Sequence, residues 1–357
     1  MQQALYRKYR PQSFKEVLGQ DHITSVLESE AKSGKVSHAY LFAGSRGTGK
    51  TTLARIFARS LGVNSEDVYE MDAASNRGID EVREIRDAVH AYPYSSKYKV
   101  YILDEAHMLT RDAWNALLKT LEEPPSHVIF ILATTEAHKL PDTIISRCES
   151  FIFKKPTHRM LADNILKVAK EEKNELEKSS ASLIATLAGG SFRDALSILQ
   201  KAMSLSKDKK LNSEEIEKIL GAPKQEFILS IIEALSEQNT SKALEVLKKA
   251  SGENADMQVL LKMLVQKLRF VLLLRFAPKT SATKDSKNGD LRDMVAMETG
   301  EKEFERLVEI AKASKNINSK TLLAFLEAES LQKYADIPEL PIEIAIIESC
   351  DVTPPLS

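Results

Sequence analysis

The stretch GSRGTGKT at residues 44–51 constrains the fold of this chain more than any other. It follows the apolar run HAYLFAG and precedes TTLARIFARSL, whose apolar residues recur at helical spacing. Gly44, Gly47 and Gly49 allow backbone conformations that a Cβ atom disfavours, so the N–H groups of the loop can surround an anion at the start of the helix. The pattern G-x-x-x-x-G-K-[ST] between a strand and a helix predicts a phosphate-binding P-loop.

The polar residues of this loop have predicted roles. Lys50 is expected to reach the β- and γ-phosphates of a nucleoside triphosphate, and Thr51 to bind the accompanying Mg²⁺. Thr48 and Thr52 lie beside them and are expected among the nucleotide contacts. A glycine-rich turn that matches by chance is the alternative, but the flanking strand and helix favour ATP and Mg²⁺ as cofactors.

The first 156 residues alternate short apolar runs with helical stretches. Helices are expected, for example, at residues 51–61 and 111–123. The third and fourth apolar runs are continuous, as in strands buried on both faces. This alternation predicts an α/β fold with a mostly parallel sheet and right-handed crossovers. The strands are expected at residues 38–44, 67–73, 98–106, 127–135 and 150–156.

Two adjacent carboxylates end the third expected strand, in VYILDEAH at residues 100–107. In P-loop proteins an acid at this place holds Mg²⁺, and here it is Asp104. Glu105 beside it is expected to orient or deprotonate the attacking water. Capping of a following helix is the alternative. The letters DEAH also occur in helicases, but a helicase of that type needs a second nucleotide-binding lobe, and the carboxyl half lacks a second set of strands.

The fourth expected strand ends with two hydroxyls, Thr134 and Thr135. Nucleotides bind at the carboxyl ends of parallel strands, so either threonine is placed to hold the water or contact the γ-phosphate. Strand-end threonines that satisfy backbone groups are the alternative.

After Pro156 the strand pattern stops and helical periodicity continues. AGGSF (188–192) reads as a turn between helices, and GAP (221–223) as a stop signal. The polar stretch at residues 279–290 reads as a mobile loop. The predicted domains are 1–156, 157–221 and 222–357.

Composition bounds the class of protein. The chain is 43% hydrophobic and 28% charged, with a net charge of −1, which is typical of a globular protein rather than one that coats nucleic acid by bulk charge. Cys148 and Cys350 are too few for a cysteine-framed zinc site, so no zinc is expected, and they favour a reducing, cytoplasmic location. No apolar stretch predicts a signal peptide or a membrane span.

Eight motifs in series resemble one family, the ATPase subunit of the bacterial DNA polymerase III clamp loader of the gamma/tau type. This is an AAA+ ATPase related to replication factor C. The motifs are KYRPQSFKEVLGQ (8–20), GSRGTGKT (44–51), DAAS (72–75), DEAHML (104–109), ALLKTLEEPP (116–125), LATT (132–135), LPDTIISRC (140–148) and GGSFRDALS (189–197).

The resemblance implies roles for further residues. Arg147 in SRC would be an arginine finger that completes the ATP site of a neighbouring subunit. No acid precedes it by one helical turn, and a finger would explain an arginine without a local partner; a surface charge is the alternative. Arg193 would be the second sensor, although a lid surface residue is the alternative, and Thr135 the first sensor. The adenine pocket would be lined by Tyr9, Arg10, Pro11 and Val17.

The resemblance also implies architecture and partners. It implies an AAA+ core (1–156), a helical lid (157–221) and an all-α collar for oligomerisation (222–357). The expected partners are delta-type and delta-prime-type subunits, a sliding clamp and primer–template DNA bound through its phosphates. Ser75 or Asn76 is expected as a helix cap and Arg77 as a phosphate contact, with an ordinary cap as the alternative.

The sequence departs from the family in two places. Members usually carry a four-cysteine zinc module after the P-loop helix, whereas residues 58–75 contain no cysteine. The chain also stops at Ser357, without the long extension of tau-type proteins, so a gamma-like chain or a shortened one is expected.

The expected function is ATP-dependent loading of the sliding clamp onto primed DNA, with hydrolysis at subunit interfaces. Two alternatives stay open. Another AAA+ DNA motor, such as a branch-migration protein, would need its own DNA-binding winged helix. A nucleotide-binding scaffold would not need Lys50, Asp104, Glu105 and Arg147 together.

Overall fold

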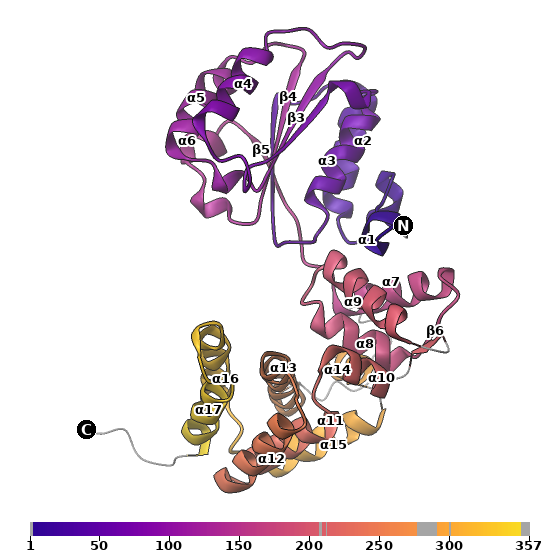
Figure 1. The fold of residues 1–357 in the computed structure, drawn as a ribbon, viewed down its shortest axis with the longest axis vertical. Helices are drawn as coiled ribbons and strands as arrows, with labels where there is room; N and C mark the ends of the chain where they lie inside the picture. The colour runs from indigo at the N-terminus through magenta and orange to yellow at the C-terminus, as the bar shows by residue number, and fades with distance from the viewer. Residues whose placement is uncertain (1–2, 207–208, 212, 277–290, 300, 351–357) are drawn as a thin grey trace, which may run out of the picture. The chain divides into compact units, whose positions relative to one another are not determined.

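The computed structural model describes residues 3–206, 209–211, 213–276, 291–299 and 301–350 (Figure 1). The chain divides into two compact units. One comprises residues 1–161 and 190–197, and the other comprises residues 162–189 and 198–357. The three predicted domains divide the chain differently and stay a prediction.

A five-stranded parallel sheet organises the first unit, in the order β2-β3-β4-β1-β5. The α/β fold class and the five predicted strands are confirmed. The strands are β1 (Ala39–Ala43), β2 (Val68–Asp72), β3 (Lys99–Asp104), β4 (Val128–Thr134) and β5 (Glu149–Ile152).

Helices cover both faces of this sheet (Figure 1). Successive residues of β3 point to opposite faces: Tyr101 and Leu103 join one apolar cluster, Val100 and Ile102 the other. This is why β3 and β4 are continuously apolar and buried, as predicted. One face is covered by α4 (Ile79–Ala88), α5 (Arg111–Glu122) and α6 (Asp142–Ile145), and the other by α2 (Asp21–Ser33) and α3 (Lys50–Ser60).

Parallel pairing brings the carboxyl ends of the strands to one edge. Ala43 pairs with Thr134, and Asp72 pairs with Asp104. The predicted polar residues follow these strand ends, so they gather at the same edge of the sheet.

Asp67 holds the short connection between α3 and β2. Its side chain is buried and accepts hydrogen bonds from the backbone N–H groups of Tyr94, Ser95 and Ser96 at 2.5, 3.0 and 2.9 Å. Burial alone would raise the pKa of this carboxyl, but the hydrogen bonds outweigh it and lower the pKa to about 2. The carboxylate therefore joins residues 94–96 to the start of β2.

The second unit is built mainly of helices, as predicted. A buried ion pair joins two of them: Lys267 of α13 lies 2.5 Å from Glu303 of α15, and both side chains are at most 8% exposed. The helices after β5 are α7 (His158–Glu171), α8 (Lys178–Leu187), α9 (Phe192–Leu205), α10 (Ser213–Leu220), α11 (Gln225–Ser236), α12 (Thr240–Gly252), α13 (Met257–Phe276), α14 (Leu291–Thr299), α15 (Glu301–Ala313), α16 (Ser319–Leu331) and α17 (Leu340–Cys350).

The prediction that strands stop at Pro156 is wrong in one detail. A parallel ladder joins β6 (Glu175–Leu176) to β7 (Lys210–Leu211). Strands of two residues are too short to show the alternation that reveals a strand in a sequence.

The predicted turn at residues 188–192 covers the connection from α8 to α9 and the first residue of α9, Phe192. The predicted stop at residues 221–223 lies between α10 and α11. The predicted loop at residues 279–290 lies outside the described residues. In the part of the chain that the structure describes, no helix has the length and apolar character needed to span a membrane.

Candidate nucleotide-binding site

The P-loop joins β1 to α3 in the predicted strand–loop–helix arrangement. Gly47 and Gly49 adopt positive φ angles of 75° and 100°, which L side chains rarely adopt. A Cβ atom on Gly47 would lie 1.9 Å from the Ser191 hydroxyl oxygen, and the carbonyl of Gly47 accepts a hydrogen bond from the Phe192 N–H at 3.1 Å. Glycine is therefore required at residue 47 both by its conformation and by the neighbouring segment.

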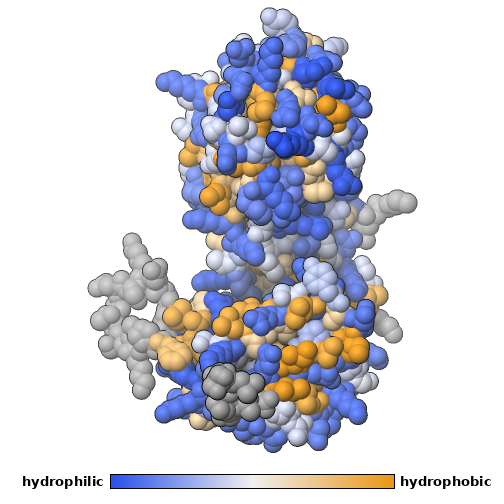
Figure 2. All heavy atoms as spheres, turned by 90° about the vertical axis from the view of Figure 1, so that its left-hand side faces the viewer, coloured by the Kyte–Doolittle hydropathy of each residue, from blue (hydrophilic) through white to orange (hydrophobic). Residues whose placement is uncertain are grey.

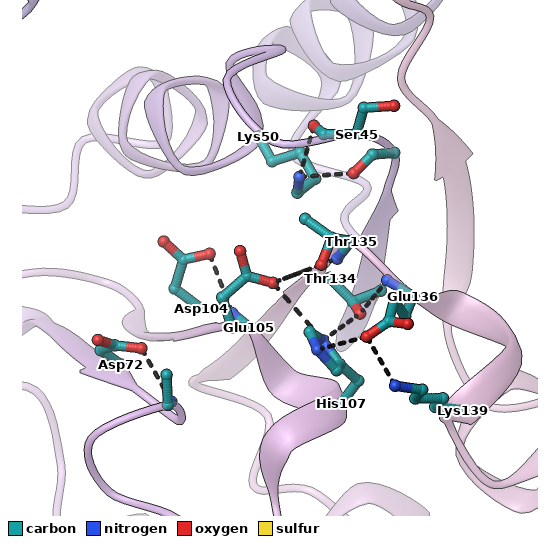
Figure 3. A network of polar contacts seen from close by, with 12 residues as sticks. Ser45, Lys50, Asp72, Asp104, Glu105, His107, Thr134, Thr135, Glu136 and Lys139 are labelled. Carbon is teal, nitrogen blue, oxygen red and sulfur yellow. Dashed lines mark hydrogen bonds and ion pairs between the residues drawn. The ribbon is translucent and has the colours of Figure 1, made fainter. Parts of the chain in front are cut away.

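Lys50, the first residue of α3, is buried and folds back onto the loop (Figure 3). Its ammonium donates to the carbonyls of Gly44 and Ser45 at 2.7 and 3.0 Å. Burial lowers the pKa of Lys50, and the charges of Glu105 and Asp104 oppose that shift. The cation is thus held where the loop would meet phosphate.

The three threonines of the P-loop region have different contacts. Thr48 is buried and donates from its hydroxyl to the Ser45 carbonyl at 2.8 Å, which closes the loop. Thr51 donates to the Asp104 carboxylate at 2.8 Å. Thr52 lies in the first turn of α3.

The pair of Thr51 and Asp104 fits Mg²⁺. A hydroxyl and a carboxylate oxygen side by side are the hard oxygen ligands that this ion prefers, and Mg²⁺ in such sites takes one or two protein ligands together with phosphate and water. Within the described residues, no group of three His, Cys, Asp or Glu side chains is arranged to hold a metal by itself.

Glu105 follows β3 in a left-handed conformation, with a φ of 49° that is uncommon for a residue with a side chain. Its carboxylate accepts hydrogen bonds from the Thr135 hydroxyl at 2.9 Å and the Thr135 N–H at 3.3 Å (Figure 3). Of the two threonines left open by the sequence, Thr135 therefore contacts Glu105.

Thr134 contacts a residue that the sequence analysis left without a role, His107. The His107 side chain is 7% exposed, and its ring lies between β4 and the segment that follows it (Figure 3). Nδ1 is 3.0 Å from the Thr134 hydroxyl, and Nε2 is 3.1 Å from the Glu136 carboxylate. In the sequence, the spacing of His107 from the other histidines does not suggest a metal site. Its position shortly after Asp104 and Glu105 is the feature that could have pointed to it.

Arg193 lies in the same compact unit as the P-loop. Its guanidinium stands 5.7 Å from the centre of the Tyr6 ring. Its charge lowers the pKa of Lys50, although less than burial does. It also lowers the pKa of Arg10, after burial and after Arg55. The predicted second sensor therefore lies near the P-loop lysine and the amino-terminal segment.

The residues predicted for the adenine pocket belong to this amino-terminal segment. Tyr9 ends α1 (Leu5–Lys8), and Arg10 and Pro11 follow it. Val17 ends the 3₁₀ turn at Phe14–Glu16 and packs against the apolar cluster that contains α2 and α3. Their contact with adenine stays a prediction.

Arg147 is not without a local partner, and that part of the prediction is wrong. Its guanidinium lies 2.6 Å from the carboxylate of Glu122, at the end of α5, and donates to the Thr143 carbonyl at 2.7 Å. The acid lies far earlier in the sequence than one helical turn, so the search for a partner one turn away could not find it. The arginine is 33% exposed and Glu122 47%, so the pair is open to exchange.

The predicted cap between β2 and α4 is also wrong. The residue before α4 is Gly78, and no side chain caps the helix. Ser75 and Asn76 instead bond to Asp72, through the Ser75 hydroxyl at 3.2 Å and the Asn76 amide at 3.1 Å. These short side chains satisfy the turn after β2, which competes with capping. Arg77 is exposed in this turn.

Solved structures show the fold. The RuvB Holliday junction branch migration motor of Thermotoga maritima matches with a TM-score of 0.51 and 24% sequence identity, over 64% of this chain and 79% of that chain. A structure of a mutant of the same RuvB protein matches with a TM-score of 0.52 and 23% identity, over the same shares of the two chains. The core therefore has a RuvB-like fold.

Three family models match successive parts of the chain. The DNA polymerase III delta subunit model matches residues 19–76 and 63–157. The ATPase lid domain of the DNA polymerase III clamp loader subunit matches residues 161–208, and domain III of DNA polymerase III subunits gamma and tau matches residues 211–313.

Curated relatives agree with these models. DNA polymerase III subunit tau of Bacillus subtilis is 40% identical over 98% of this chain and 64% of its own length. The tau subunit of Escherichia coli is 34% identical over 86% of this chain and 49% of its own length, so the chain spans about half to two thirds of these tau subunits. DNA polymerase III subunit gamma of Buchnera aphidicola is 38% identical over 78% of this chain and 82% of its own length. The chain belongs to the gamma/tau subunit family of the DNA polymerase III clamp loader.

Proposed function

We propose that this chain is a cytosolic ATPase that loads the sliding clamp onto primed DNA within the DNA polymerase III clamp loader. The observation that carries the proposal is the hydrogen bond of 2.8 Å between Thr51 and Asp104, beside a buried Lys50 that already lies across the P-loop carbonyls. The chain thus presents an oxygen pair for Mg²⁺ and a cation for phosphate at one edge of the sheet.

Each residue of this edge has a role in the proposed reaction. When bound, ATP supplies the phosphoryl group, and Mg²⁺ supplies positive charge that neutralises the phosphate oxygens. Lys50 would exchange its two carbonyl partners for phosphate oxygens, and Thr51 and Asp104 would hold the metal. Glu105 accepts the proton of the attacking water, and Thr135 fixes the carboxylate through the bond of 2.9 Å.

Arg147 would act on the ATP of a neighbouring subunit. The charged groups that act on Lys50 are Glu105, Asp104 and Arg193, whereas Arg147 bonds to Glu122 on α5. A finger of this type contributes about 10³–10⁵ in rate, or roughly 4–7 kcal/mol. Hydrolysis is then slow until subunits are aligned, which lets ATP act as a timer for gripping and releasing the clamp.

Exposed apolar side chains on the carboxyl-terminal helices support an assembly of subunits. Figure 2 views the chain from the side of α16 and α17 and shows apolar side chains at the surface of this helical part. Uncovered apolar surface of this kind marks sites of protein association. A head-to-tail arc with delta-type and delta-prime-type subunits would cover it and pass one finger along the series. The exposed residues include Leu323 and Leu331 of α16, Ile344 and Ile347 of α17, and Tyr334 and Ile337 of the segment between them.

The turn that contains Ser75, Asn76 and Arg77 is the proposed contact with the DNA backbone. Exposed Arg77 would meet phosphate, so binding would not depend on base sequence and would weaken as salt rises. Replacing Arg77 with alanine is expected to reduce the stimulation of ATPase by DNA and to lower its salt dependence.

The test uses Lys50→Ala and Arg147→Ala proteins, assayed alone and as an equal mixture. Steady-state ATPase is measured with partner subunits, clamp and primed DNA present. In the mixture, an intact P-loop can face an intact finger at some interfaces, so the mixture should exceed both single variants. Normal hydrolysis by Arg147→Ala alone would refute the role of the finger.

A stimulus control separates this proposal from another AAA+ DNA motor. Primed DNA with clamp should stimulate ATPase, and four-way junctions should not. Stimulation by junctions alone would favour a branch-migration motor, and turnover that no stimulus changes would favour a nucleotide-binding scaffold.

A further inference from the structure

The His107 ring is locked in place by a closed circuit of hydrogen bonds. The carboxylate of Glu136 can only accept, so His107 Nε2 carries the proton shared with it at 3.1 Å. In the neutral ring with its proton on Nε2, Nδ1 is an acceptor, so the Thr134 O–H donates to it at 3.0 Å while the Thr134 hydroxyl oxygen accepts from the Glu136 N–H at 3.0 Å. The side chains of His107, Thr134 and Glu136 thus satisfy one another and fix the orientation of the ring.

The locked ring stands directly behind the proposed catalytic carboxylate. His107 Nδ1 lies 3.5 Å from Glu105 Oε2, which is contact distance rather than a hydrogen bond once Nδ1 accepts from Thr134. The same Glu105 oxygen is held from another side by the Thr135 hydroxyl. The carboxylate is therefore confined between Thr135 and the ring (Figure 3).

The circuit also reaches the segment that carries Arg147. Glu136 begins the connection from β4 to the 3₁₀ turn Ala137–Lys139 and then to α6, which ends two residues before Arg147. His107 itself follows β3 in the turn Ala106–Met108. The His107 side chain thus connects the turn after β3, which carries Glu105, with the segment after β4, which leads to Arg147.

We propose that His107 is a positioning residue that holds the Glu105 carboxylate in place and ties it to the segment leading to Arg147. The inference rests on the proposed roles of Glu105 and Arg147 in ATP hydrolysis. His107 needs no contact with substrate, because it acts through the position of two other side chains. A displacement of about 1 Å in a reacting group can cost about 10²-fold in rate.

The first experiment compares His107→Phe with His107→Gln. Phenylalanine keeps a ring behind Glu105 but cannot bond to Thr134 or Glu136, whereas glutamine can donate to one and accept from the other. His107→Phe is expected to lower kcat about 10- to 100-fold, with the affinity for a fluorescent ATP analogue changed less than about threefold. His107→Gln should recover most of the loss.

Matched variants keep this test interpretable. His138→Phe replaces an exposed histidine in the neighbouring turn and should leave kcat unchanged. If His107→Phe does not fold, Glu136→Ala opens the circuit from a side chain that is 37% exposed, with Lys139→Ala as its control because Lys139 pairs with Glu136. Wild-type kcat in His107→Phe, or in Glu136→Ala where that variant replaces it, would overturn the proposal. An equal loss in His107→Phe and His107→Gln would do the same.

A mixing experiment tests the tie to Arg147. A Lys50→Ala, His107→Phe double variant cannot hydrolyse its own ATP and can contribute only its finger. Mixed with Arg147→Ala protein in the complete assembly, it should support less ATPase than Lys50→Ala does in the same mixture. Equal rates would show that His107 does not influence the finger segment and would refute the tie.

Loss of the proposed ATPase function and loss of the positioning role would give different results. Loss of turnover in Lys50→Ala, with rescue by Arg147→Ala in the mixture, tests the proposed function without any change at His107. If that rescue occurs and His107→Phe behaves as wild type, only the positioning role is refuted.

Discussion

The ion pair between Arg147 and Glu122 leads to a testable prediction about the proposed arginine finger. If Arg147 acts on a neighbouring subunit, it must first leave Glu122. Glu122 then competes with the ATP of the neighbouring subunit for the Arg147 guanidinium. Glu122→Gln removes the charge and keeps the shape of the side chain. With the two groups 33% and 47% exposed, the pair contributes about 0.2–1 kcal/mol. Its loss should raise the ratio of released to held finger by about 1.4- to 5-fold.

The assay is the steady-state ATPase of the assembly at saturating ATP, with clamp and primed DNA. Glu122→Gln should raise kcat by a factor within that range if release of the finger limits the rate. Glu123→Gln, which changes the next acid in the sequence, is the matched control and should have no effect. In an Arg147→Ala background, Glu122→Gln should change nothing, because the two residues act through one interaction.

Two results would refute this reasoning. A fall in kcat for Glu122→Gln would mean that the pair holds the finger in its working orientation rather than away from it. An equal rise in the Arg147→Ala background would mean that Glu122 acts through some other group.

Three further predictions concern the P-loop and the stability of each unit. Gly47→Ala forces a Cβ toward the Ser191 hydroxyl and a left-handed conformation that costs about 1–2 kcal/mol; nucleotide affinity and melting temperature should both fall, and wild-type affinity would contradict the clash. Asp67→Asn should lose about 1.5–3 kcal/mol at neutral pH. The pKa of Asp67 is lowered from 3.8 to about 2 in the folded protein, so its charge stabilises the fold above pH 3.8 and this stabilisation is lost as the pH falls toward 2. Urea unfolding of both proteins at several pH values measures the difference in stability. A difference that does not change with pH would contradict the prediction. Lys267→Met strands the buried Glu303 charge and should destabilise the second unit by about 3–5 kcal/mol; adding Glu303→Leu should recover most of it in thermal unfolding, and no recovery would argue that packing rather than charge was lost.

The sheet was largely predictable, and its order was not. Each strand has its own apolar run, and the P-loop fixes where β1 ends. The order β2-β3-β4-β1-β5 depends on pairings between residues far apart in the chain, such as Ala43 with Thr134. A single sequence carries the local pattern of each strand but no direct record of its neighbours.

In the candidate site too, local patterns were predictable and contacts between distant parts of the chain were not. The P-loop, Asp104 and Glu105 are recognisable because short motifs carry their chemistry. The partner of Arg147 was missed because Glu122 lies on another helix and only the folded chain brings it close. The contacts of His107 were missed because Thr134 ends a different strand and Glu136 follows that strand. Helix caps follow local geometry, and at α4 the turn bonds of Asp72 took the side chains expected as caps.

The apolar surface of α16, α17 and the segment between them has a consequence for the cell that makes this chain. A copy produced in excess of its partners would keep side chains such as Leu323, Ile337 and Tyr334 in water, where they favour self-association and invite proteolysis. The balance between this chain and its partners during synthesis would then determine how much of it survives. The surface itself would then provide quality control, because assembly would cover the apolar side chains that favour the removal of unassembled copies.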